Sequence, residues 1–147
     1  MGASSSIRPS LSNEIYISSP PKNNELINFL YTKLVDLNYN IIKISETANQ
    51  NQTENNKILN CYYLIICITP DIITSLQQIK LINNAWNHNK NIIYIITDDN
   101  YSPRNNREVK IIVQYDPWFL CTEKAAIIES LEGITHLLGN DGKKREA

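Results

Sequence analysis

Hydroxyl and carboxylate side chains that follow apolar segments are the residues of this chain best suited to bind a small polar ligand. Ser18 and Ser19 end the first apolar segment, and the sequence Thr-Pro-Asp at 69–71 follows the third. This order is typical of a helix start, with Thr69 as cap and Asp71 near the positive end of the helix dipole. The predicted ligand crevice comprises Ser18, Ser19, Thr69, Asp71 and Asp98. The alternative is that these residues serve only as caps and turns.

Several common catalytic motifs are absent from the sequence. Glycine occurs only at positions 2, 133, 139 and 142, so the chain has neither a phosphate-binding P-loop nor a dinucleotide fingerprint. His88 and His136 have no HExxH neighbour or Cys pair, so we expect no metal site. No GxSxG elbow presents a nucleophilic serine. Ordinary kinase and hydrolase functions are therefore not expected, nor is a resident cofactor.

The composition is typical of one globular domain. The 147 residues are 42% hydrophobic and carry a net charge of -1. Because basic and acidic residues are interspersed, no basic stripe suggests a nucleic-acid partner. Cys61, Cys67 and Cys121 form no CxxC pair and no even disulfide framework, which favours reduced thiols in an intracellular protein.

The elements that must position the crevice are organised around the segment from Cys61 to Asp99. Its apolar runs at 62–69 and 91–97 lack polar alternation, as do strands of a parallel sheet covered by helices on both faces. Further strands are expected at 14–18, 40–44 and 117–120, and helices at 24–37, 70–86 and 122–138, with Gly139 as the last cap. Residues 109–113 fit a short helix or a short strand. This alternation predicts a three-layer, doubly wound α/β fold with a five-stranded parallel sheet in the order 2-1-3-4-5.

Apolar residues at helical spacing predict the buried faces of the three helices. These residues are Leu26, Leu30, Leu34 and Leu37 in the first helix, Ile72, Leu76, Ile79, Ile82 and Trp86 in the second, and Ile127, Ile128, Leu131, Ile134 and Leu138 in the last. Trp86 has two interpretations: a rim aromatic that closes its helix against the sheet, or an anchor for a partner.

The two ends of the chain predict a membrane contact. Residues 1–12 read as a flexible leader that matches the N-myristoylation pattern, with Gly2 as the acylated residue. A Ser-rich leader without lipid is the alternative. One myristoyl chain binds membranes only reversibly, and the basic cluster Lys143-Lys144-Arg145 in the tail 139–147, which we expect to be disordered, would add weak attraction to anionic lipid. The predicted location is therefore cytoplasmic and peripheral on membranes.

The order of motifs resembles that of the Toll/interleukin-1 receptor (TIR) domains, a flavodoxin-like family. The resemblance rests on EIYIS at 14–18, LVDLNY at 34–39, NCYYLIICITP at 60–70, KNIIYII at 90–96 and DPWFL at 116–120. It spans about residues 13–138. The loop after the second strand departs from the family, because it lacks the usual Arg-Asp and Pro-Gly elements.

The resemblance implies either self-associating signalling or cleavage of NAD at the nicotinamide–ribose bond. The enzymes of the family carry a Glu on the helix after the third strand, yet no Asp or Glu occurs from Ile72 to Thr97, and the family position falls near Lys80 or Leu81. A cation or an alkyl group cannot stabilise an oxocarbenium ion as a carboxylate does.

We therefore expect a catalytically inactive interaction module, an adaptor or decoy that binds a TIR-domain or other signalling protein and is able to form homo-oligomers. Its predicted interaction surface comprises Glu46, Asn49, Gln52, Glu54 and Trp86. The alternative is an enzyme or sensor of NAD or other nucleotide metabolites. It would bind its ligand weakly in the crevice, with Asp71, Asp98 or Asp99 as the carboxylate.

Overall fold

The computed structural model describes residues 13–19, 25–45, 60–68 and 76–144 of the chain. Its centre is a sheet of five parallel strands in the order β2-β1-β3-β4-β5. The strands are β1 (Ile15–Ser19), β2 (Ile41–Ser45), β3 (Tyr63–Ile68), β4 (Ile92–Ile96) and β5 (Trp118–Leu120). The predicted fold class and strand order are confirmed.

The apolar runs become the central strands because both of their faces are covered. In β3, Leu64, Ile66 and Ile68 join the core on one face of the sheet, and Ile65 and Cys67 join the core on the other. All five residues of β4 are buried. Strands in this position have no solvent face, which is why their sequence shows no alternation of polar and apolar residues.

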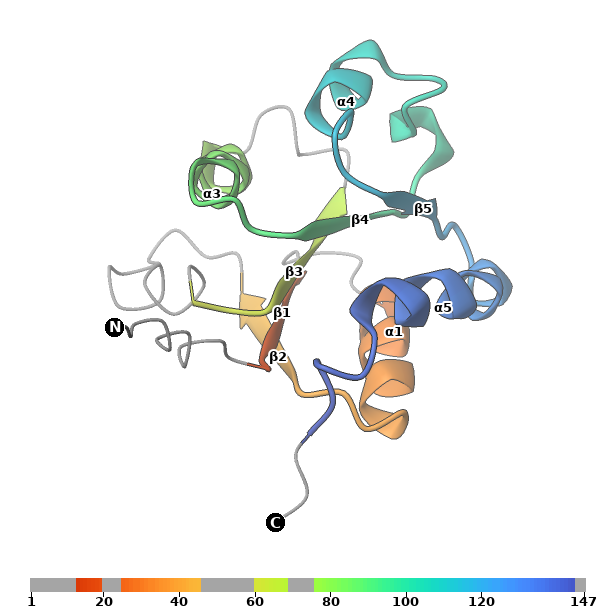
Figure 1. Ribbon diagram of the computed structural model, residues 1–147. Helices are drawn as coiled ribbons and strands as arrows, with labels where there is room; N and C mark the ends of the chain where they lie inside the picture. The colour runs from red at the N-terminus through yellow and green to blue at the C-terminus, as the bar shows by residue number, and fades with distance from the viewer. Residues whose placement is uncertain (1–12, 20–24, 46–59, 69–75, 145–147) are drawn as a thin grey trace, which may run out of the picture.

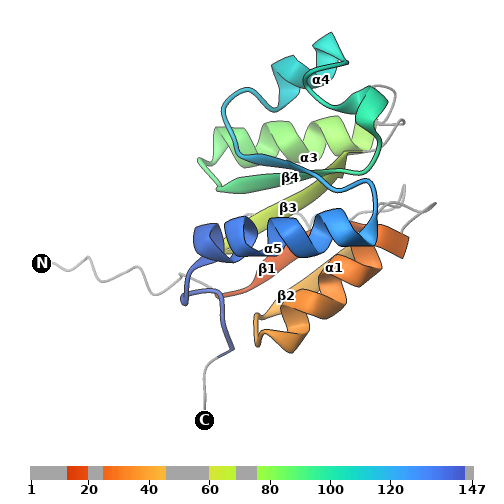
Figure 2. The same ribbon diagram turned by 90° about the vertical axis from the view of Figure 1, so that its right-hand side faces the viewer.

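Helices form the outer two layers, as Figures 1 and 2 show. One face of the sheet packs against α1 (Glu25–Asp36) and α5 (Lys124–Leu138). The other packs against α3 (Leu76–Asn87) and α4 (Arg107–Ile112), and a short 3-10 helix, η2 (Asp99–Tyr101), follows β4. The segment 109–113, for which helix and strand were both open, falls mostly in α4. The Asn106 side chain caps this helix by accepting hydrogen bonds from the Glu108 and Val109 amides.

The buried faces of the helices differ from the prediction at two positions. Leu37 lies just after the end of α1 and its side chain is 44% exposed, because the helical spacing no longer applies there. Ile128 in α5 is 54% exposed. Its neighbour Ile127 is fully buried, and consecutive helix residues point about 100° apart, so both cannot face the sheet. In α3, Leu81 and Ala85 are buried as well as Ile82.

The end of the chain is more ordered than the sequence predicts. Gly139 ends α5 with φ of 62°, as expected of a helix cap, but residues 140–144 then run against the start of β2. The Asn40 amide donates to the Gly142 carbonyl at 2.9 Å, and the Lys144 amide donates to the Asn38 carbonyl at 2.8 Å. The prediction of a disordered tail from residue 139 is therefore wrong for residues 139–144.

Four predicted features lie outside the described residues: the leader 1–12 with Gly2, the polar loop 46–56, the helix start at 69–75 with Thr69, Asp71 and Ile72, and Arg145 of the basic cluster. Among the helices that the structure describes, none has the length and apolar character needed to cross a bilayer.

Candidate functional site

The predicted ligand crevice lies where the strand order reverses, at the carboxyl ends of β1 and β3. Ser18 is fully buried near the end of β1, and Ser19 is the last residue of that strand. Thr69 and Asp71 lie outside the described residues. The structure therefore places Ser18 and Ser19 at this point of the sheet, and the predicted crevice itself stays a prediction.

Asp98 follows β4 and acts as a helix cap. Its Oδ1 accepts a hydrogen bond from the Asn100 amide at 2.9 Å, which satisfies the first turn of η2. Asp99 is exposed, and its carbonyl accepts a hydrogen bond from the Asn105 side chain at 2.9 Å. This geometry favours the interpretation of Asp98 as a cap over its interpretation as a ligand.

The helix that follows the third strand offers no acid to the crevice. The sequence of α3 contains no Asp or Glu over its whole length. Lys80 is exposed, and Leu81 packs into the core with only 6% of its surface exposed. At the two positions where the resemblance would place a catalytic carboxylate, α3 therefore carries an exposed cation and a core residue.

Trp86 belongs to a half-buried polar cluster that the sequence did not reveal. Its side chain packs at the rim of the core, and its Nε1 donates a hydrogen bond to Asp116 Oδ2 at 3.1 Å. Nearby, the Tyr94 hydroxyl is fully buried and has no hydrogen-bond partner among the described residues. The cluster joins α3, β4 and the turn before β5.

Burial controls the ionisation of this cluster. It raises the pKa of Asp116, while the hydrogen bond from Trp86 acts in the opposite direction. Burial raises the pKa of Tyr94 far above its ordinary value, and the charge of Asp116 adds to that effect. Tyr94 therefore remains a neutral phenol, and the arrangement resembles a structural contact more than a proton-transfer site.

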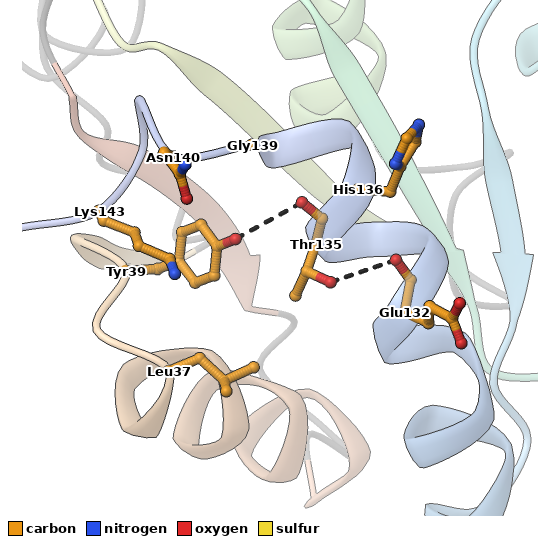
Figure 3. A pocket seen from close by; sticks show the side chains of 8 residues that line it. All are labelled: Leu37, Tyr39, Glu132, Thr135, His136, Gly139, Asn140 and Lys143. Carbon is orange, nitrogen blue, oxygen red and sulfur yellow. Dashed lines mark hydrogen bonds between the residues drawn. The ribbon is translucent and has the colours of Figure 1, made fainter.

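A groove of about 460 Å³ lies between the carboxyl ends of α1 and α5 (Figure 3). It is at the amino ends of the strands, whereas the predicted crevice is at their carboxyl ends. Its lining residues are Leu37, Tyr39, Glu132, Thr135, His136, Gly139, Asn140 and Lys143. The Tyr39 ring lies between Lys143 and Thr135 (Figure 3). The Tyr39 hydroxyl donates to the Thr135 carbonyl at 3.5 Å, and Lys143 Nζ is 5.5 Å from the centroid of the Tyr39 ring.

The chain supplies its own cation to this groove. The carboxyl end of a helix carries partial negative charge and favours cations. Lys143 brings an ammonium group there, over an aromatic face that also attracts it. The sequence could not reveal this groove, because its residues come from the end of α1, the end of α5 and the C-terminal segment 140–144. These segments meet only when the C-terminal segment docks.

The cysteines are poor nucleophiles in this setting. None of the three forms a disulfide, and all three are buried. Burial raises the pKa of Cys61 to about 11, and it also raises the pKa of Cys121, whose Sγ lies 3.7 Å from Ser130 Oγ. Since the thiolate is the reactive form, the raised pKa values make Cys61 and Cys121 poor nucleophiles at neutral pH. In the part of the chain that the structure describes, no three His, Cys, Asp or Glu residues gather as metal ligands.

No protein-family model and no curated protein matches the chain. It is similar to a solved structure of a fungal multi-domain GH3 β-N-acetylglucosaminidase, described as having a unique GCN5-related glucosamine N-acetyltransferase region, with a TM-score of 0.62 and 17% identity. The match covers 96% of this chain and 16% of that one. At this identity the likeness concerns the fold alone, so neither enzymatic activity carries over.

Proposed function

We propose that this chain is a TIR-like protein-interaction module that does not cleave NAD, and that it acts as an adaptor or decoy for a TIR-domain or other signalling protein. The observation that carries the proposal is the absence of any carboxylate on α3, the helix after the third strand of the sheet. Cleavage of a nicotinamide–ribose bond develops positive charge on the ribose, which a nearby carboxylate stabilises.

The environment of α3 supports this reasoning. Leu81 contributes to the core, so a carboxylate at that position would be buried without a partner. Lys80 is exposed and would oppose the developing positive charge. The outward residues of α3 are polar and mostly uncharged: Lys80, Asn83, Asn84 and Asn87. They suit a protein contact, and the proposal assigns binding to them and to the loop 46–56, which lies outside the described residues.

The membrane part of the proposal rests on Gly2 as a myristoylation site. Asn13, where the described chain begins, donates a hydrogen bond from its side chain to the Lys143 carbonyl at 2.9 Å. The described chain thus begins beside Lys143 and Lys144. A leader that carries a lipid would therefore be attached to the domain next to these two cations. A lipid and a basic contact together bind membranes better than the lipid alone.

The catalytic part is tested by incubating the purified full chain with NAD and following nicotinamide release. We expect no turnover above that of a heat-denatured sample. Turnover that disappears in the variant Asp71→Ala would overturn the proposal and support the alternative, an enzyme that uses the crevice at the carboxyl ends of β1 and β3.

The interaction part is tested by pull-down with the wild-type chain and with a variant in which residues 46–56 are replaced by a Gly/Ser linker of equal length. Asp36→Asn, an exposed change at the end of α1, is the control variant. We expect partner capture by the wild type and the control but not by the loop variant. Equal capture by all three would remove the loop from the model.

The lipid part is tested by the intact mass of protein produced with an N-myristoyltransferase. We expect added acyl mass in the wild type and none in Gly2→Ala, with a parallel loss of recovery on vesicles. Equal vesicle recovery of the two proteins would contradict the proposed tether.

A further inference from the structure

Two exposed isoleucines lie on opposite layers of the domain, and each has two charged residues of like sign close to it on its helix: basic ones for the first, acidic ones for the second. Ile111 on α4 is 57% exposed, and Ile128 on α5 is 54% exposed. Single exposed apolar residues are common on protein surfaces. The sign and placement of the charges around these two are what make them informative.

The exposed face of α4 is basic. Arg107, Lys110 and Ile111 are spaced by three and four residues, so they share one face of the helix, and all three are exposed. Tyr115, three residues after the end of the helix, is 82% exposed. Glu108 is the one acidic residue of α4, and it is next to Arg107 in the first turn, where it faces the positive end of the helix dipole.

The exposed face of α5 is acidic. Ala125, Ile128, Glu129 and Glu132 are exposed and share one face by the same spacing. The only Lys or Arg of α5, Lys124, is already engaged at the start of the helix, because its Nζ lies 3.4 Å from Glu25 Oε1 and 5.4 Å from the centroid of the Phe29 ring. Ile128 is therefore bordered by two carboxylates, and the cation four residues before it, Lys124, is paired with Glu25.

These two faces cannot meet within one molecule. The buried side of α4 packs on one face of the sheet and the buried side of α5 on the other, with the sheet between them (Figure 2). Their exposed sides consequently point away from each other. Only a second molecule can bring a basic α4 face against an acidic α5 face.

We propose that the α4 face of one copy of this chain binds the α5 face of another. The contact would pair Arg107 and Lys110 with Glu129 and Glu132 around the two isoleucines. This inference deepens the proposed interaction function and rests on it, by naming a second copy as one partner. Because the two faces differ, the contact is head-to-tail, and repetition gives either a closed ring or an open filament.

The charges set the conditions under which the association appears. Pairs of exposed charges gain little energy each and are screened by salt, with a Debye length of about 30 Å at 0.01 M and about 3 Å at 1 M ionic strength. Association should therefore be visible at low ionic strength and high protein concentration, and weak at high ionic strength.

The test is sedimentation velocity of the full chain at low and high ionic strength over a range of protein concentrations. We expect the average mass of the wild type to rise above that of the monomer with concentration at low ionic strength only. Arg107→Glu with Lys110→Glu, and separately Glu129→Lys with Glu132→Lys, should each weaken self-association by at least about tenfold, since attraction is replaced by repulsion.

Mixing the two reversed variants makes the test decisive. Each variant then offers the other a matching pair of faces, so the mixture should associate although neither variant does alone. Lys43→Glu, an exposed reversal on β2, is the control that should still self-associate. Thermal unfolding of every variant establishes that the fold is retained.

Three results would overturn the inference: a monomeric wild type at low ionic strength, self-association that is unchanged by both reversals, or a mixture that stays monomeric. If the wild type is monomeric and the α4-reversed variant no longer captures a partner, the basic face would instead be assigned to a different, acidic protein. These outcomes are separate from those of the NAD and loop experiments, which measure other surfaces.

Discussion

Replacing Gly142 by Ala should weaken the packing of residues 140–144 against the start of β1 and β2. Gly142 is buried, and a Cβ added there would lie 2.6 Å from Ile15 Cδ1 and 3.4 Å from both Ile15 Cγ1 and Tyr39 Cδ1. Ile15 is fully buried in β1, so it has little freedom to move away. Overpacking of a filled core costs about 1–3 kcal/mol. No gain in helix propensity offsets it, since residue 142 is not helical.

The measurement is chemical and thermal unfolding of Gly142→Ala beside the wild type. At about 2–4 °C per kcal/mol for a domain of this size, the loss should appear as a fall in Tm of several degrees. Hydrogen exchange gives a local readout, because the Asn40 amide donates to the Gly142 carbonyl and should lose protection first.

Ile15→Val provides the matched background, because it removes Cδ1, the atom that would clash. Ile15→Val alone should cost about 0.5–1.5 kcal/mol. Adding Gly142→Ala to it should then cost little more, so the two changes should show favourable coupling. Equal cost of Gly142→Ala in both backgrounds, or no cost in either, would refute the proposed docking of residues 140–144.

Three further changes test the packing of α5 and the polar cluster. Gly133→Ala should destabilise the wild type, because the added Cβ would lie 2.8 Å from Phe119 Cε1. In a Phe119→Leu background the same change should instead stabilise the fold by up to about 1 kcal/mol, because Ala has a higher helix propensity than Gly. The unfolding midpoints of the wild type, the two single variants and the double variant test both expectations. Tyr94→Phe should leave the free energy of unfolding unchanged or raise it by about 1 kcal/mol, because it removes a buried hydroxyl without a partner among the described residues; a loss of similar size would reveal a bridging water. Asp116→Asn should raise stability at neutral pH while keeping an oxygen acceptor for Trp86. Burial raises the pKa of Asp116 in the folded state above its ordinary value of 3.8, so the folded state binds the proton more tightly than the unfolded state. The free energy of unfolding of the wild type should therefore increase as the pH falls from the raised pKa toward 3.8. The Asn variant should not show this increase when both proteins are unfolded in urea across the same pH range.

The sequence predicted the sheet well because its signals are local. The runs that became β3 and β4 are long, apolar and rich in β-branched residues, and both are buried on each face in the structure. Parallel strands joined by helices permit few arrangements, so the order of the strands followed from handedness and short connections.

The candidate site was less predictable because side-chain environments depend on residues far apart in the chain. Asp98 looked like a ligand or a cap from the sequence, and the hydrogen bond from the Asn100 amide favours the cap. The contact between Trp86 and Asp116 spans 30 residues and could not be inferred from either residue's neighbours. The exposure of Ile128 was misjudged because an apolar residue at the border of a helical stripe faces either way.

By itself, the sequence determined the class of the fold, the order of its strands and the lack of a carboxylate on α3, since each depends on residue types along one segment. Only the tertiary structure decided that residues 140–144 dock on the start of β2, that a groove forms around Tyr39 and Lys143, and that the charged faces of α4 and α5 point apart. These features depend on contacts between distant segments, whose free energy comes from packing and hydrogen bonds that no local pattern records.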